Sequence, residues 1–396
     1  MLRRIGSVAA LLLMLLAAAP AAAAEPIGEP AFQRLWDRTG VPIQRGAASY
    51  SWVWGPAPFT PPLGEAFAEG QGGRRTVQYF DKSRMEINNP NGDASSPWFV
   101  TNGLLVNELI EGQVQTGLSD FIPLAPANIP LAGDPSNTFP TYASLIRIYR
   151  TPVGRALGSH VISEFLPEGA NDLPQYANTP ATEITHIERS FGIPRAFWDF
   201  LNARGTVFEN NRLVGNQPIF DWLFTVGYPT TDAFWARVRI GGVERDVMFQ
   251  AFERRVLTYV PTNPTQFQVE MGNVGQHYYQ WRYVQPFSGG KSVLITVPEA
   301  GATVFSPLVV RGFENGTAFE AAITVRLRVK ASGAVLATDH IQVVRPDIGL
   351  AGPFTANLAF TAPAAATPAT IEVLTFSAQD GSEIPLASED VVLGKR

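Results

Sequence analysis

Residues 250–261 read QAFERRVLTYVP, and residues 78–90 read the similar QYFDKSRMEINNP. Both stretches join the motif Gln-x-Phe-acid to alternating apolar residues, and both end at a proline. Alternation with a period of two predicts strands that bury one face, so each stretch is predicted to form a β-hairpin. The charged residues Glu253-Arg254-Arg255 are expected at the hairpin turn, where their charges stay in water.

The sequences on either side of these two hairpins also repeat in the same order. Before each hairpin, a helical stretch is expected to close at Gly-x-Pro, because glycine accepts the left-handed position after a helix and proline prevents its continuation. After each hairpin, a Val-x-x-Gly motif leads into another apolar stretch. The helical stretches are Phe32–Pro42 and Phe220–Pro229, and the closing stretches are Phe99–Leu109 and Gln268–Tyr279. This order predicts a duplicated α+β module, with copies over residues 25–118 and 216–287.

Residues 119–215 lie between the two copies and are predicted to be an insert made mainly of helix and loop. One helix is expected to begin at Thr179-Pro180 and to stop at the Gly-x-Pro of residues 191–194. A second helix is expected over Arg195–Arg204, with Phe197, Phe200 and Leu201 buried and Gly205 ending it.

The composition changes sharply near residue 288. All eight tryptophans lie before residue 282, and β-branched alternation becomes dense after Ser288-Gly-Gly-Lys291. Residues 288–291 are therefore predicted to be a linker. Short alternating segments separated by turn pairs such as Asn315-Gly316 and Asp380-Gly381 predict a β-sandwich over residues 292–396.

The first residues predict export. A short positive start, an apolar run and the alanine tract Ala17–Ala24 are typical of a signal peptide over residues 1–24, cleaved before Glu25. The alternative is an uncleaved N-terminal anchor. No later segment is long and apolar enough to predict a membrane span. The expected location is therefore secreted, extracellular or in the cell envelope.

Composition also excludes several functions. The formal charge is −5 and no long basic run occurs, which argues against nucleic-acid binding. The absence of cysteine excludes a thiol nucleophile, disulfides and a lipid-modified cysteine. The only nearby metal-type pair is His186-x-Glu188, which would point to different faces of the predicted helix. No catalytic residue, metal or cofactor is therefore assigned.

Two families resemble parts of this sequence. Residues 292–396 resemble the immunoglobulin-like domain of bacterial spore germination proteins, through Val297-Pro298, Ser306-Pro-Leu308, Val310-x-Gly312, Gly352-Pro-Phe354 and Phe376-Ser-Ala-Gln-Asp-Gly-Ser382. The resemblance implies a non-catalytic sandwich attached to an exported or envelope protein. The duplicated module resembles the LGFP repeat of bacterial envelope proteins, through the turns Thr39–Pro42 and Val226–Pro229, which implies association with the cell wall.

Carboxylates and aromatic residues are the remaining candidates for function. Asp81 and Glu253 occupy equivalent positions in the two copies, and two carboxylates about 5–10 Å apart in an open cleft could hydrolyse a glycosidic bond. The alternative, which we favour, is that these groups only cap turns. The other carboxylates considered for such a pair are Glu86, Asp199, Asp221 and Glu270.

Aromatic residues give the better signal for binding. Trp52 and Trp54 would share one face of a strand, and Tyr228 and Trp235 lie at a similar place in the second copy. Exposed rings stack well against the apolar faces of sugars, so these four residues are predicted to bind ligand; the alternative is that they fill the core. Trp36 and Trp222, on helix faces, are assigned to the core.

These observations together predict a multi-domain protein with duplicated α+β modules, a helical insert and an all-β immunoglobulin-like sandwich. The expected function is that of an exported, non-enzymatic envelope protein that binds cell-wall glycan or an envelope partner. A hydrolase of wall polysaccharide that uses paired carboxylates, and a protein–protein scaffold, remain the alternatives.

Overall fold

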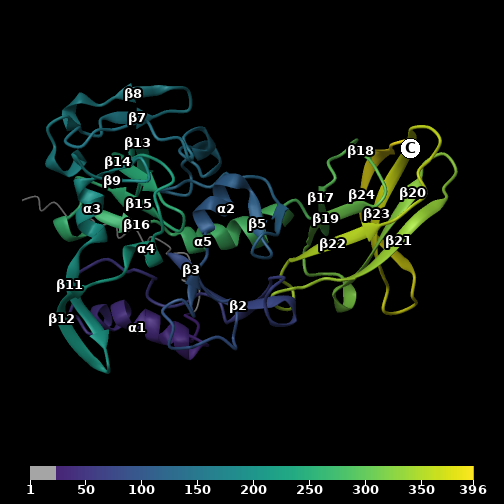
Figure 1. Ribbon diagram of the computed structural model, residues 1–396, viewed down its shortest axis with the longest axis horizontal. Coiled ribbons are helices and arrows are strands. Elements are labelled where there is room, and N and C mark those ends of the chain that lie inside the picture. Colours follow the sequence, from purple (N-terminus) through teal and green to yellow (C-terminus); the bar gives the residue numbers. More distant parts are fainter. Residues whose placement is uncertain (1–23, 396) are drawn as a thin grey trace, which may run out of the picture.

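The computed structural model describes residues 24–395 and consists of a larger N-terminal part, residues 24–287, and a β-sandwich at the C-terminal end (Figure 1). Strands account for 38% of the structure and helices for 18%, so the chain is mostly β-sheet. Nearly all of the predicted signal segment, residues 1–23, lies outside the described residues. Within residues 24–395, no helix combines the length and the apolar character that a bilayer span needs.

Helix α1 (Pro30–Gln44) begins with a proline at its first position, where the missing N–H is not needed. The predicted stop at Gly40-x-Pro42 is wrong, because α1 runs through both residues. Gly40 instead makes room for a ring, since a Cβ atom at this position would lie 2.5 Å from Trp36. Pro42 removes only one backbone bond, near the end of the helix, and so does not terminate it.

The first sheet follows α1 and has four antiparallel strands in chain order. These are β1 (Leu63–Ala66), β2 (Arg74–Phe80), β3 (Ser83–Ile87) and β4 (Thr101–Asn102). Helix α2 (Leu105–Glu111) comes next and ends at Gly112, which takes a left-handed conformation. A short two-stranded ribbon, β5 (Gln113–Gln115) with β6 (Phe121–Pro123), then leads towards the sandwich. The predicted hairpin at residues 78–90 therefore becomes β2–β3.

The second sheet has six strands in the order β16-β15-β14-β13-β7-β8. Its members are β7 (Ser163–Phe165), β8 (Ala170–Asp172), β13 (Phe234–Ile240), β14 (Val243–Ala251), β15 (Val256–Tyr259) and β16 (Val269–Met271). Helix α5 (Val274–Tyr279) follows β16 and continues as a π-helical turn over Gln280–Val284. The second predicted hairpin therefore becomes β14–β15.

The predicted helical insert differs most from the structure. Residues 119–215 contain one α-helix, α3 (Arg195–Leu201), which is shorter than predicted but does bury Phe197 and Leu201. Where a helix was predicted up to Pro194, the chain instead forms the hairpin of β9 (Ile184–Glu188) and β10 (Phe191–Pro194). A two-stranded ribbon of β11 (Arg204–Glu209) and β12 (Arg212–Pro218) then precedes the short helix α4 (Trp222–Thr225). Gly205 lies within β11 and so does not end α3.

The two hairpins make matching hydrogen bonds. Gln78 Nε2 donates to the carbonyl oxygen of Thr60 at 2.8 Å, and Thr60 Oγ1 accepts the N–H of Tyr79. Gln250 Nε2 donates to the carbonyl oxygen of Thr231 at 2.9 Å, and Thr231 Oγ1 accepts the N–H of Ala251. The residues opposite each glutamine also match in position, since Gln78 pairs with Met85 and Gln250 pairs with Leu257.

Two hydrophobic clusters fill the N-terminal part, and each draws side chains from both hairpins. One contains Tyr79 and Phe249, and the other contains Phe80 and Phe252. Successive residues of a strand face opposite sides, so each hairpin contributes to both clusters. The two hairpins therefore pack together in both clusters.

One prediction about the hairpin turn is wrong. Arg255, expected to stay in water with Glu253 and Arg254, is fully buried. Its guanidinium lies over the ring of Trp54 and donates to Ser83 Oγ at 2.5 Å, while its Nε and Nη2 atoms have no hydrogen-bond partner in the described part of the chain. Burial, and then the charge of Arg254, lower the pKa of Arg255 to about 9. Packing between the two hairpins explains the difference, because Ser83 belongs to the other hairpin.

The C-terminal domain is a sandwich of two sheets around its own core. One sheet has the order β17-β19-β22 and the other β18-β24-β23-β20-β21. The strands are β17 (Val293–Val297), β18 (Thr303–Val304), β19 (Leu308–Glu314), β20 (Ala322–Val329), β21 (Val335–Gln342), β22 (Gly352–Leu358), β23 (Thr367–Phe376) and β24 (Glu383–Leu393). Val310 and Phe354 from one sheet and Val325 from the other are among the buried core residues. These strands agree with the predicted alternating segments.

The sandwich also contacts the N-terminal part through more than the linker. Arg311 forms an ion pair with Asp120 at 2.9 Å, and Arg74 donates to the carbonyl oxygen of Arg345 at 2.7 Å. Phe313 packs into the hydrophobic cluster that contains Tyr79. The two parts lie side by side along the long axis of the molecule (Figure 1).

Candidate functional site

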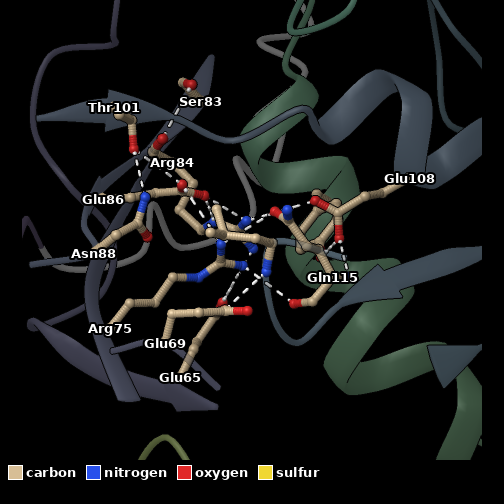
Figure 2. A network of polar contacts seen from close by, with 12 residues as sticks. Glu65, Glu69, Arg75, Ser83, Arg84, Glu86, Asn88, Thr101, Glu108 and Gln115 are labelled. Carbon is tan, nitrogen blue, oxygen red and sulfur yellow. Dashed lines mark hydrogen bonds and ion pairs between the residues drawn. The ribbon is translucent and has the colours of Figure 1, made fainter. Parts of the chain in front are cut away.

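A buried network of charged side chains lies where the first sheet meets the helices (Figure 2). Glu65 of β1 is at its centre, and its Oε2 atom accepts hydrogen bonds from Arg282, Arg84 and Arg75 at 2.8, 3.1 and 3.4 Å. Its Oε1 atom accepts the hydroxyls of Tyr79 and Tyr283 at 2.6 and 2.7 Å. The network therefore joins β1, β2 and β3 to the π-helical turn that follows α5.

Two further carboxylates complete this network, and their pKa values are shifted in opposite directions. Glu86 accepts two hydrogen bonds from Arg84; burial alone would raise the pKa of Glu86, but Arg75 and Arg84 lower it. Glu108 lies at the far side, where it accepts the N–H of Gln115 and the hydroxyl of Tyr278. Burial raises the pKa of Glu108 above its ordinary value, because Arg84 and Arg75 offset only part of the cost. Glu65 remains ionised, since Arg282, Arg84 and Arg75 overcome its burial and lower its pKa.

A pair of carboxylates with opposite pKa shifts is a feature of acid–base catalysis. Such a pair can act on a polysaccharide only if the substrate reaches it. Glu65, Glu86 and Glu108 are 0%, 4% and 3% exposed, so a polysaccharide cannot reach any of them. The buried arginines are matched with these carboxylates and with tyrosine hydroxyls. The arrangement links the first sheet to the segment that follows α5.

The other predicted carboxylates lie in turns or on the surface. Asp81 Oδ1 accepts the side-chain amide of Gln276 at 2.7 Å, and Glu253 Oε2 accepts the N–H of Tyr228 at 3.0 Å. Asp221 caps α4 by accepting the N–H of Phe224, and Asp199 is exposed on α3. Glu270 is partly exposed on β16. Asp81 and Glu253 therefore both anchor their hairpin turns to a neighbouring segment.

The four rings predicted to bind ligand divide into two groups. Trp54 is 2% exposed and Trp235 is fully buried, with its Nε1 atom donating to the carbonyl oxygen of Val161. Both therefore pack in the core, and Trp52 and Trp54 do not share a strand, because residues 51–54 form no strand and bend at residues 53–54. Trp52 and Tyr228 keep exposed surface, and Trp52 stacks on Trp36 with ring centroids 6.1 Å apart.

Tyr228 belongs to a row of partly exposed rings that we call the aromatic strip, made of His186, Trp198, Trp222 and Tyr228. The ring centroids of His186 and Trp198 are 3.7 Å apart and nearly parallel. Trp222 is 6.0 Å from Trp198 and 6.4 Å from Tyr228, in edge-to-face contacts. Four segments supply the strip: β9, α3, α4 and the turn after α4 (Figure 1).

Of the four residues of this strip, the sequence predicted only Tyr228 as a binding residue. Trp222 was assigned to the core, but α4 is a single turn and leaves its ring partly exposed. Trp198 lies on the outer side of α3, next to the buried Phe197. His186 and Glu188 lie on a strand rather than a helix, so their side chains share one face, with His186 Nε2 3.7 Å from Glu188. Residues 24–395 contain no group of three or more such ligands suited to a metal ion.

The tip of the β9–β10 hairpin covers one end of the aromatic strip. Arg189 is exposed, and its guanidinium carbon lies 3.3 Å from the centroid of the Tyr228 ring. Arg189 and Ser190 have φ angles of 49° and 73°, in the left-handed region that most residues avoid. The tip therefore places a guanidinium over the last ring of the strip.

Two cavities lie away from the strip, since none of its four residues lines them. One of about 490 Å³ lies between the N-terminal part and the sandwich, lined mainly by apolar residues that include Leu124, Trp281 and Leu294. Another of about 410 Å³ lies beside the β11–β12 ribbon, around Tyr50 and Phe200. Neither cavity brings several charged groups together.

The two sheets of the C-terminal domain define it as an immunoglobulin-like sandwich, and a comparison with known families agrees. Residues 292–382 match the family described as the immunoglobulin-like domain of bacterial spore germination. This range contains β17 to β23, so the match identifies the sandwich and leaves the N-terminal part unassigned. No curated protein matches the chain. The resemblance of the N-terminal part to the LGFP repeat stays a prediction.

Proposed function

We propose that this is an exported, non-enzymatic protein of the cell envelope that binds wall glycan through the aromatic strip. The single observation that carries this proposal is the continuous row of partly exposed rings from His186 to Tyr228. Sugars present apolar C–H faces that pack on aromatic rings, and successive rings can hold successive sugar units of one chain. The buried state of the carboxylates Glu65, Glu86 and Glu108 supports binding over hydrolysis.

We further propose that the two hairpins arose by duplication of an α+β module. The matching contacts of Gln78 with Thr60 and of Gln250 with Thr231 support this origin. Isolated bridges support it as well, since Pro58 pairs with Phe80 and Pro229 pairs with Phe252. On this basis the repeated turn of the first copy contains Pro58 rather than Pro42, which lies inside α1.

In this proposal the immunoglobulin-like sandwich has no binding site of its own and serves as a spacer or adhesion unit. Its contacts with the N-terminal part hold it in a defined position. A glycan-binding surface on the N-terminal part would then sit at a fixed distance from whatever the sandwich contacts.

The test is co-sedimentation of residues 25–396 with purified insoluble cell-wall sacculi. We expect the protein to sediment with sacculi and to release no reducing ends from them. The variants Trp198→Ala and Trp222→Ala should each reduce the bound fraction several-fold, because stacking on one ring contributes about 1 kcal/mol. Trp98→Ala is the matched control, since Trp98 is 59% exposed and contacts Phe224 instead of the strip.

Two results would count against the proposal. If the parent protein stays in the supernatant, glycan binding is wrong, and an envelope protein becomes the expected partner. If Trp198→Ala and Trp222→Ala sediment as well as Trp98→Ala does, the protein binds wall glycan through another surface.

A further inference from the structure

Arg189 lies in a strained hairpin turn, and comparable turns of this chain carry asparagine or glycine at that position. Between residues 24 and 395, three hairpins have a two-residue turn in which both residues have positive φ angles: Arg189-Ser190, Asn210-Asn211 and Gly241-Gly242. Glycine and asparagine are the residues that this turn favours. Only the tip that reaches Tyr228 uses arginine and serine. Strain that persists at one turn among three points to a function for the side chain held there.

The charge of Arg189 has no partner within the part of the chain that the structure describes. Among residues 24–395, no carboxylate lies within ion-pair distance of its guanidinium, and it makes no hydrogen bond to another side chain. Two neighbouring carboxylates are engaged elsewhere: Glu188, the preceding residue, faces His186, and Glu253, which accepts the N–H of Tyr228, pairs with Arg254. The guanidinium carbon lies over the Tyr228 ring, and the exposed side chain keeps its N–H groups available for a ligand.

We propose that Arg189 gives the aromatic strip a preference for glycans whose sugars carry carboxylates. A guanidinium presents two parallel N–H groups that match the two oxygens of a carboxylate. A sugar stacked on Trp222, beside the Tyr228 ring that Arg189 covers, would bring an acidic substituent to the guanidinium at the end of the strip. This inference rests on the proposed glycan-binding function and names the class of glycan.

The experiment compares native sacculi with sacculi whose carboxyl groups have been converted to neutral methylamides. We expect the parent protein to bind native sacculi about tenfold more tightly, the effect of one charged hydrogen-bonded pair. Arg189→Gln should bind both preparations with the affinity that the parent shows for amidated sacculi. Arg189→Lys should keep part of the preference, because lysine retains the charge but not the planar pair of donors.

Arg212→Gln is the matched control. Arg212 is exposed at the start of β12, and within the described residues it forms no ion pair. This variant should keep the full preference of the parent. Thermal melting of each variant checks that the hairpin tip still folds.

The outcomes separate the two ideas. If the parent protein binds neither preparation, the proposed function fails and the preference fails with it. If the parent binds both preparations equally, or if Arg189→Gln keeps the preference for native sacculi, only the role of Arg189 is overturned. If Arg189→Gln loses the preference while Trp222→Ala loses binding to both preparations, both ideas are supported.

Discussion

Replacing Glu65 with glutamine should strongly destabilise the N-terminal part. Glu65 accepts three hydrogen bonds from arginines and two from tyrosine hydroxyls, and it is fully buried. Glutamine keeps the shape but removes the charge that offsets Arg75, Arg84 and Arg282. Removing one partner from a buried ion pair costs about 3–5 kcal/mol, because the remaining charge is left uncompensated. We expect a loss of that size in the free energy of unfolding.

Glu108→Gln is the matched control, because the substitution and the burial are the same. The Oε1 atom of Glu108 makes no hydrogen bond in the described structure, and Arg84 lies 3.6 Å from it. Burial raises the pKa of Glu108, so its charge is already disfavoured. Glutamine should therefore change the free energy of unfolding by no more than about 1 kcal/mol.

Urea unfolding followed by tryptophan fluorescence measures both variants. All eight tryptophans lie before residue 282, so this signal reports the N-terminal part and not the sandwich. The reasoning is refuted if Glu65→Gln is no less stable than Glu108→Gln at neutral pH.

The pH dependence gives a second check, and its sign differs between the two residues. The pKa of Glu65 is lowered in the folded state, so its contribution is complete above the ordinary value of 4.5 and is lost as pH falls below it. The deficit of Glu65→Gln relative to the parent should therefore shrink on acidification. The pKa of Glu108 is raised, so the parent loses stability as pH rises through that pKa, and Glu108→Gln should gain relative to it.

Three further predictions concern other parts of the molecule. Ser190→Gly should raise the free energy of unfolding by about 1 kcal/mol, because glycine accepts the φ of 73° without strain, and glycan binding should be unchanged; lower stability in urea would contradict this. The free energy of unfolding of Arg255→Met should be within about 1 kcal/mol of the parent's or higher, since this buried cation has no carboxylate partner among the described residues. A loss above about 3 kcal/mol would show that the contacts of Arg255 with Ser83 and Trp54 outweigh the cost of burying its charge. Burial, with the charge of Lys82, lowers the pKa of His277 to about 4, so stability should fall as pH drops from 6.5 towards 4, and His277→Asn should remove that part of the acid loss.

Local sequence pattern determined a large part of this fold. The strands of the sandwich and the β2–β3 and β14–β15 hairpins follow from alternation and turn residues, which act over a few neighbouring positions. The matching Gln-x-Phe motifs were also visible, and the two hairpins do make matching hydrogen bonds. Such features can be predicted because their causes lie within the same short segment.

Tertiary packing overrode local signals in other places. Gly40-x-Pro42 is a stop signal by sequence, yet α1 continues, since Gly40 packs on Trp36 and Pro42 lies near the helix end. The segment before Pro194 pairs as a hairpin rather than a helix. Arg255 is a charged residue in a predicted turn, but the other hairpin covers it. The sequence alone does not show that the two hairpins lie side by side.

The candidate site depended almost entirely on the tertiary structure. The sequence showed that aromatic residues are abundant, and it predicted Tyr228 as a binding residue, but it could not tell a buried ring such as Trp235 from a partly exposed one such as Trp222. The aromatic strip joins residues from four separate segments, and the network around Glu65 joins residues from β1 to the turn after α5. Periodicity reports only which face of a segment is apolar, whereas exposure and contact depend on which other segment covers that face, and long-range packing alone decides this.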